Sequence, residues 1–180
     1  VLQGIASSRE VLGLVFNDGF AALTIPYDAP GDPSPTLRSE YGRAGAISPR
    51  AICKGPAGEL AWIGEEGIVF ANTAGIESIA HQIGCNQFWG KAVSAEWLDE
   101  TDLENIVMSY SRAHEGYVFG NFTINGTAGG WGLLTLKPQL GLWVFNGQTI
   151  TSNILEYPDQ YGQGVIIAGD AVSGRLKRLL

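Results

Sequence analysis

The residues with the clearest potential for catalysis are two adjacent carboxylates, Glu65 and Glu66. A glycosidase needs two carboxylates that face the same glycosidic bond. Neighbouring residues in a strand or tight turn point to opposite sides of the chain, so these two are poorly placed to act on one bond. We interpret the pair as the polar tip of a hairpin and not as a catalytic dyad.

Two other groups of residues carry side chains that can bind metal ions. Acidic residues gather between positions 99 and 104, but they lack the spacing and central glycine of a calcium-binding loop. Thr101 and Glu104 match a helix capping box instead. His81 and Cys85 would share one face of a helix, yet His114 is the only other histidine, and a zinc site needs three or four ligands. We therefore predict no metal and no other cofactor.

The cysteines and a glycine-rich segment are the remaining candidates for a reactive site. Cys53 and Cys85 lie at no evident helix N-terminus and beside no cluster of cations that would lower a thiol pKa. We expect buried free thiols, with a disulfide between them as the alternative. The segment 126–132 lacks the Lys-Ser/Thr of a phosphate-binding loop, so we expect a flexible loop there. The sequence therefore predicts no catalytic residues and no enzyme.

The tryptophans carry the remaining signal for a binding surface. Three of them fall in predicted strands and are expected in the core: Trp62, Trp131 and Trp143. Trp89 and Trp97 fall in irregular sequence, where an aromatic ring with a polar atom serves a contact surface or a platform for a sugar. We take Trp89 and Trp97, together with Tyr41, as the candidate contact surface for a protein or a glycan.

Composition limits the class of protein. Of the 180 residues, 16% are charged, against roughly 25% in ordinary domains, and 25 are glycine. Both values favour a turn-rich β protein with neutral contact surfaces. The formal net charge of −7 argues against a nucleic-acid partner, since the only basic cluster is the short one formed by Arg175, Lys177 and Arg178. No apolar run approaches the ~18 residues of a membrane span, so we expect no membrane partner.

The elements that must position these residues are short strands. The stretch 51–79 holds four apolar runs, Ala51–Lys54, Leu60–Ile63, Ile68–Asn72 and Ile76–Ile79, separated by glycine-centred turns. Glycine adopts the positive φ of hairpin turns without steric cost, and residues such as Val, Ile, Trp and Phe suit a pleated surface. This spacing predicts an antiparallel four-stranded meander, near the size of one propeller blade.

The rest of the chain continues the pattern around two long loops. The Asn17-Asp18-Gly19 turn predicts a hairpin between Val11–Phe16 and Phe20–Ile25. Pro26–Arg43 is predicted to be a long exposed loop because prolines cannot donate ladder hydrogen bonds. Gln87–Glu104 is expected to be a loop or a short helix. Further strands are expected at Ile106–Tyr110, Tyr117–Ile124, Trp131–Leu136, Leu142–Phe145, Ile150–Leu155, Val165–Ala168 and Leu176–Leu179.

We therefore predict an all-β fold with little helix. Residues 1–180 are expected to form a single β domain of antiparallel four-stranded meanders, a propeller or part of one. About 40 to 45 residues per blade give roughly three to four blades, whereas a closed ring has 4 to 8. Because the sequence begins at Val1 without a methionine, a fragment of a larger propeller is one interpretation.

Four segments rich in turn and core residues follow one another along the chain: LAWIGEEGIVFANTAGIESIA from Leu60, SYSRAHEGYVFGNF from Ser109, LGLWVFNG from Leu140 and GVIIAGDAVSGRLKRL from Gly164. Together they resemble the blade pattern of propeller-like structural proteins in phage and prophage tails. The hairpin Trp62–Gly67 and the closing segment Gly169–Leu176 match that pattern best.

The resemblance implies a structural role in a tail hub, nozzle or head-to-tail connector. The implied partners are other tail or connector proteins and further copies of this chain. The implied location is the virion tail, after synthesis in the bacterial cytoplasm. The alternative function is a carbohydrate- or receptor-binding β module that uses the loop tryptophans Trp89 and Trp97.

Overall fold

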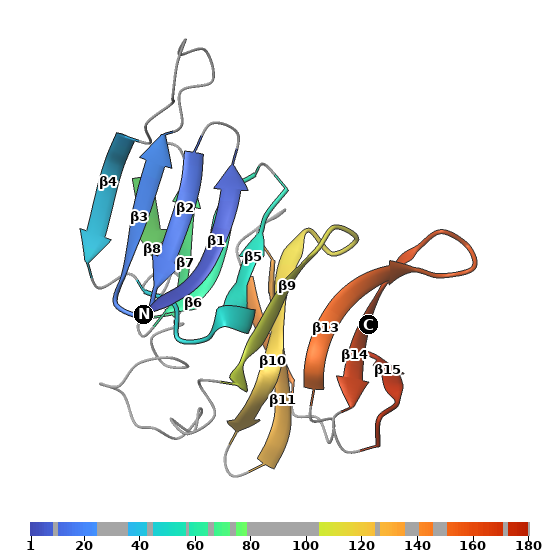
Figure 1. Ribbon diagram of the computed structural model, residues 1–180. Coiled ribbons are helices and arrows are strands. Elements are labelled where there is room, and N and C mark those ends of the chain that lie inside the picture. The colour runs from blue at the N-terminus through green and yellow to red at the C-terminus, as the bar shows by residue number, and fades with distance from the viewer. Residues whose placement is uncertain are drawn as a thin grey trace.

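The computed structural model describes residues 1–8, 11–24, 36–42, 45–56, 58–64, 67–72, 75–78, 105–124, 127–135, 141–145, 151–170 and 173–179. Nearly all of them lie in antiparallel strands or in the turns between strands, and the helical part is a short 3-10 turn, Pro49–Ala51. For this part of the chain the prediction of an all-β fold with little helix is confirmed (Figure 1).

The strands form four sheets, which we name A to D in chain order, and within each sheet every strand pairs with the next strand along the chain. Sheet A contains β1 (Leu2–Ser8), β2 (Val11–Phe16), β3 (Gly19–Thr24) and β4 (Thr36–Gly42). Sheet B contains β5 (Ile52–Lys54), β6 (Leu60–Gly64), β7 (Gly67–Asn72) and β8 (Gly75–Ser78). Sheet C contains β9 (Val107–Ser111), β10 (Gly116–Ile124), β11 (Thr127–Thr135) and β12 (Gly141–Phe145). Sheet D contains β13 (Thr151–Pro158), β14 (Gly164–Asp170) and β15 (Leu176–Arg178).

The predicted hairpin around Asn17-Asp18-Gly19 is confirmed. The strands β2 and β3 pair directly across this turn, with Val15 opposite Phe20. A turn of this composition supplies the positive φ or tight geometry that a short hairpin needs. Glycine-centred turns separate the strands of sheet B in the same way, and the four strands lie within one or two residues of their predicted bounds.

The predicted loop Pro26–Arg43 is wrong in its second half, because Thr36–Gly42 forms β4. Its backbone pairs with β3, with Leu37 opposite Leu23 and Gly42 opposite Gly19. Pro35 is the last proline of the segment, so the residues after it can all donate to a neighbouring strand. An edge strand needs no strict apolar alternation, which explains why the hydrophobic pattern gave no signal.

The predicted flexible loop at 126–132 is also wrong, because β11 begins at Thr127 and includes Gly129, Gly130 and Gly132. Gly132 lies directly opposite Phe119 on β10. A Cβ atom at Gly132 would lie 2.3 Å from the Phe119 ring. The glycine therefore leaves room for an aromatic ring that lies across the neighbouring strand, and it does not mark a flexible segment.

Sheet B contributes side chains from both of its faces to the core. One face packs on sheet A and the other on sheet C, so the sheets are stacked in chain order. Along β6, Leu60 and Trp62 join the apolar cluster of sheet A, whereas Ala61 and Ile63 join the cluster of sheet C. The A–B cluster contains Val15, Phe20, Ala22, Leu60, Trp62, Val69 and Ala71. The B–C cluster contains Ile63, Ile68, Phe70, Ile106, Met108, Tyr117, Phe119 and Leu134.

Sheet C repeats the alternation. Tyr117 and Phe119 of β10 face sheet B, and Val118 between them faces sheet D. The C–D cluster contains Val107, Val118, Trp131, Leu133, Ile154, Ile166 and Ala168. Sheets B and C are therefore covered on both faces, whereas A and D are the two ends of the stack.

The first strands of the sheets lie in series. Strand β9 lies alongside both β5 and β13, and a Cβ at Gly4 of β1 would lie 2.6 Å from Ile52 Cδ1 of β5. In Figure 1 the strands β1, β5, β9 and β13 follow one another across the middle of the molecule, and the later strands of each sheet spread away from them. The sheets therefore fan out from their first strands.

Candidate functional site

The outer face of sheet A is apolar and lacks a covering layer among the described residues. Alternation along β2 sends Gly13 and Val15 into the A–B seam, so its other side chains point outward. We define the A face by its outward apolar residues on β1, β2 and β3: Leu2, Ile5, Leu12, Leu14, Phe16, Ala21 and Leu23. Ile5 is 59% exposed and Leu2 is 45% exposed.

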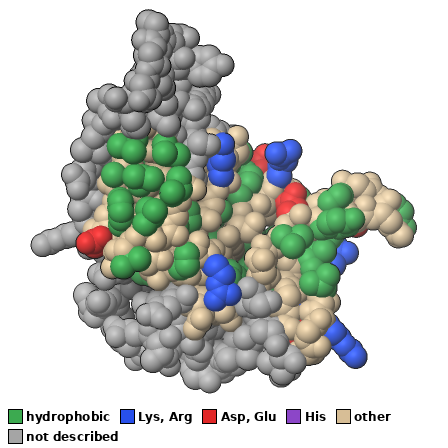
Figure 2. Space-filling model, viewed as in Figure 1, with side chains coloured by type: hydrophobic (Ala, Val, Ile, Leu, Met, Phe, Trp, Pro, Cys, Tyr) green, Lys and Arg blue, Asp and Glu red, His purple; other side chains and the backbone are tan. Residues whose placement is uncertain are grey.

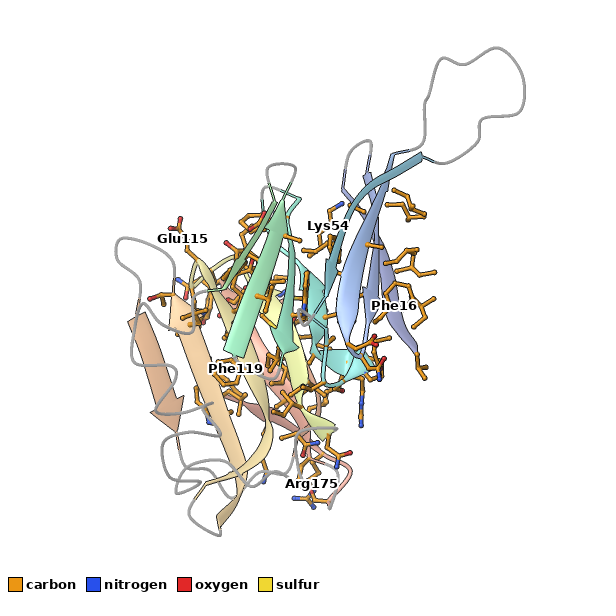
Figure 3. The ribbon with its side chains drawn as sticks, turned by 90° about the vertical axis from the view of Figure 1, so that its left-hand side faces the viewer. Phe16, Lys54, Glu115, Phe119 and Arg175 are labelled. Atoms are coloured by element: carbon orange, nitrogen blue, oxygen red, sulfur yellow. The ribbon has the colours of Figure 1, made fainter. Side chains whose placement is uncertain are left out.

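Cross-strand pairing gathers these side chains into rows. Ile5 lies opposite Leu14, and Leu14 lies opposite Ala21. Leu12 lies opposite Leu23 in the next row. Figure 2 shows hydrophobic side chains gathered over β1 to β3, and in Figure 3 the labelled Phe16 points away from the stack of sheets. The A face is therefore a contiguous apolar surface and not a set of scattered residues.

The outer face of sheet D has the same character. Ile166 and Ala168 of β14 face sheet C, so Val165 and Ile167 point outward. Their partners on β13 are Tyr157 and Leu155, which are 59% and 44% exposed. We define the D face as Leu155, Tyr157, Ile167 and Leu176, of which Leu176 is 73% exposed, and Val165 beside them is buried at 7% exposure. Figure 2 shows this second hydrophobic group over β13, in the same view as the A face.

The structure describes one of the three contact residues predicted from sequence, Tyr41. Trp89 and Trp97 lie outside the described residues. Tyr41 lies in β4, opposite Phe20, at the edge of sheet A. Of the tryptophans expected in the core, Trp62 and Trp131 are 0% and 7% exposed, which confirms their placement. Trp143 lies in β12 opposite Leu133.

Sequence reasoning missed both open faces, although a signal for them was present. The runs Val11–Phe16 and Gly19–Thr24 are apolar at outward and inward positions alike. A strand that is apolar on both sides is typical of a sheet that is covered on both faces. The composition of β2 and β3 is therefore that of strands in an interior sheet, and β14 shares it over Val165–Ala168.

One polar cluster brings together residue types that occur in hydrolases. The Ser111 hydroxyl donates to Oε2 of Glu156 over 2.6 Å and lies 3.0 Å from Nδ1 of His114. The backbone N–H of Ala113 donates to the same carboxylate over 3.1 Å. In a catalytic triad the histidine lies between serine and acid, whereas here the serine lies between them. Ser111 is also only 1% exposed, so the cluster serves to fix the β9–β10 hairpin against β13.

A second polar group spans the B–C seam. The Tyr117 hydroxyl donates to Oε1 of Glu59 over 2.9 Å. Burial and the nearby Glu59 carboxylate raise the pKa of Tyr117. Burial, with a further contribution from Glu59, raises the pKa of the Cys53 thiol to about 12. Cys53 is a free thiol, as the sequence predicted, and it stays neutral at physiological pH, so it is no activated nucleophile.

A third polar group, around the buried Asp170, lies in the β14–β15 turn. Asp170 accepts from the Ser173 hydroxyl over 2.7 Å and lies 2.9 Å from the Lys177 ammonium. It also accepts from the backbone N–H of Ser173. These contacts hold the β14–β15 turn closed. Lys177, which the sequence grouped with Arg175 and Arg178 as a basic cluster, is thereby engaged with an acid.

Within the described residues, no three His, Cys, Asp or Glu side chains lie close enough to hold a metal ion. The same residues include no helix long and apolar enough to cross a membrane. The predicted ligands His81 and Cys85 and the acidic run from 99 to 104 lie outside them. The sequence was also compared with known proteins. No protein-family model matches the chain, and no curated protein matches it.

Proposed function

We propose that this chain is a non-enzymatic structural protein that works by assembly, with its sheets as the blades of a propeller-like body. The observation that carries the proposal is that the apolar outer faces of sheets A and D have no covering layer among the described residues. An apolar face of this kind is covered at each of the three internal seams. A contiguous apolar patch on a protein surface marks a site of protein contact.

The chemistry of the described polar groups supports a structural role. Ser111, His114 and Glu156 join sheets C and D, Glu59 and Tyr117 join sheets B and C, and Asp170 closes a turn. Each group has a partner that explains it, and none lies in an open position facing a substrate. The low content of charged residues, 16%, fits a protein that buries neutral surface on assembly.

The motifs around Trp62–Gly67 and Gly169–Leu176 suggest where this assembly occurs. Their resemblance to propeller-like proteins of phage tails makes a tail or head-to-tail connector the proposed setting. The partners are then other tail or connector proteins and further copies of this chain.

Sedimentation velocity tests the proposal. We expect the purified chain, alone or mixed with tail or connector proteins of one phage particle, to form a faster-sedimenting complex. A variant with like charges on both faces, Leu14→Glu with Leu155→Glu, should lose that complex while its circular dichroism spectrum stays that of a β protein. A chain that sediments as a monomer alone and in every mixture would rule out the assembly role.

A further inference from the structure

We propose that two copies of the chain close into one ring, with the A face of each copy on the D face of the other. This proposal rests on the assembly function above and names its partner, a second copy of the same chain. The contact would be sheet on sheet, like the three seams inside each copy. The resulting ring contains two copies of four sheets.

The internal seams determine which faces are complementary. In sheet B, the face with Leu60 and Trp62 receives the preceding sheet, and the face with Ile63 contacts the following sheet. Sheet C has the same two kinds of face. The A face is the one that would receive a preceding sheet, and the D face is the one that would contact a following sheet. Contact between the A face of one copy and the D face of the other would therefore repeat the packing seen at the three internal seams.

The directions of the two faces allow one partner to cover both. Figure 2 shows the hydrophobic groups over sheet A and over β13 in a single view, so both faces are open to the same side of the molecule. Four sheets that fan out from their first strands then form about half of a ring. A second copy, rotated by a two-fold axis, brings its D face onto A and its A face onto D. The ring would have about eight blades, within the usual range of 4 to 8.

The available area fits two contacts better than one. Strands of about six residues are roughly 20 Å long, and three to four strands at ~4.8 Å spacing give each face about 300 to 400 Å². Two A–D contacts cover four faces, or roughly 1,200 to 1,600 Å², which is the size of a stable protein interface. A single A–D contact covers about half of that and falls among weak encounters.

Charge substitutions on the two faces test this arrangement, with sedimentation velocity as the readout. Ile5→Glu places an acid on the A face, and Tyr157→Lys places a base on the D face, both at well-exposed positions. Ile5→Val is the matched control for the A face. Tyr161→Lys is the control for the D face, since Tyr161 is 78% exposed in the β13–β14 turn and lies on neither face.

We expect the unmodified chain and both controls to be dimers at micromolar concentration. Each charged variant alone should dissociate, with the dimer dissociation constant raised roughly tenfold or more. An equimolar mixture of Ile5→Glu and Tyr157→Lys should form dimers again, because one contact is then unchanged and the other combines opposite charges.

Four results would contradict the proposed ring. An unmodified chain that is monomeric at micromolar concentration has no such dimer, even if it still binds another protein and the assembly function stands. A dimer that survives Tyr157→Lys joins A faces only, and a dimer that survives Ile5→Glu joins D faces only. Failure of the mixture to dimerise would show that A and D do not meet.

Discussion

The seam between sheets B and C and the A face are built from the same kinds of residue, but among the described residues only the seam is covered by a second sheet. In the seam, Ile63 and Ile68 are fully buried against Phe119 of sheet C. On the A face, Ile5 and Leu14 pair across β1 and β2 in a similar way, yet Ile5 is 59% exposed. The difference lies in the presence of a neighbouring sheet and not in the strands themselves.

The comparison shows how the internal sheets of the stack differ in stability from the two end sheets. Each internal sheet gains stability from apolar contact on both faces, at about 25 cal/mol per Å² of apolar surface removed from water. The A and D faces have no neighbouring sheet among the described residues, so they gain less of it: Leu14 is half-buried and Ile5 is exposed. The seams should therefore control folding, and the open faces should control association.

The largest effect is expected from Trp62→Ala in the A–B seam. Trp62 is fully buried and stacks on Phe20 with ring centroids 5.1 Å apart. The substitution leaves a large cavity and should lower the free energy of unfolding by about 3–5 kcal/mol. Urea denaturation measures it, with Tyr161→Ala as the control, which truncates an exposed aromatic and should change stability by less than ~0.5 kcal/mol. Equal losses in both variants would contradict the seam model.

The free energy of unfolding should depend on pH through Cys53, which packs against the B–C cluster. An unfolded thiol ionises near its usual pKa of 9.0, whereas burial and Glu59 raise the pKa of Cys53 to about 12 in the folded protein. Between these values the unfolded state binds fewer protons, so stability falls as pH rises, by up to about 1.4 kcal/mol per pH unit. Cys53→Ala should flatten this slope, and the raised pKa of Tyr117 leaves a residual decline at higher pH. An identical slope in both proteins would show that Cys53 does not contribute.

A smaller effect is expected at the C–D seam from Ser111→Ala. The substitution removes a buried hydroxyl that donates to Glu156 over 2.6 Å. The loss of this charge-assisted hydrogen bond should lower the free energy of unfolding by about 1–3 kcal/mol. Ser173→Ala, which removes an exposed hydroxyl from the Asp170 turn, is the matched comparison and should lose less. A larger loss at Ser173 would mean that the turn, and not the seam, holds sheet D in place.

The smallest effect on folding is expected on the A face itself. Ile5→Glu at concentrations too low for association should change the free energy of unfolding by no more than ~0.5 kcal/mol, since Ile5 is largely exposed. The same variant should still weaken association strongly. Chemical denaturation at low and at high protein concentration separates the two effects. A large loss of stability at low concentration would mean that the A face is already covered within one chain.

Much of the fold follows from local sequence. The Asn17-Asp18-Gly19 turn and the spacing of apolar runs in sheet B predict their strands because turn chemistry acts over a few residues. The strand β4 and the first part of β11 could not be predicted in the same way. The first is an edge strand without alternation, and the second depends on Phe119 lying over Gly132 in the neighbouring strand.

The candidate site was harder to predict than the fold. Alternation in β2 separates Val15 from Leu14, but both faces are apolar, and only the position of sheet B decides which is covered. Ser111 and Glu156 are 45 residues apart, and no local pattern indicates that they meet. The contact residues Trp89 and Trp97 are predicted from residue type and from their place in irregular sequence, and they stay a prediction.

The most direct test of the account is the mass of the unmodified chain in solution, measured by light scattering over a micromolar concentration series. Covered A and D faces predict a particle of twice the 19.2 kDa of one chain, which dissociates on dilution. A mass that stays at 19.2 kDa over the whole series would show that the chain tolerates two open apolar sheet faces, and it would contradict pairing of the A and D faces between copies.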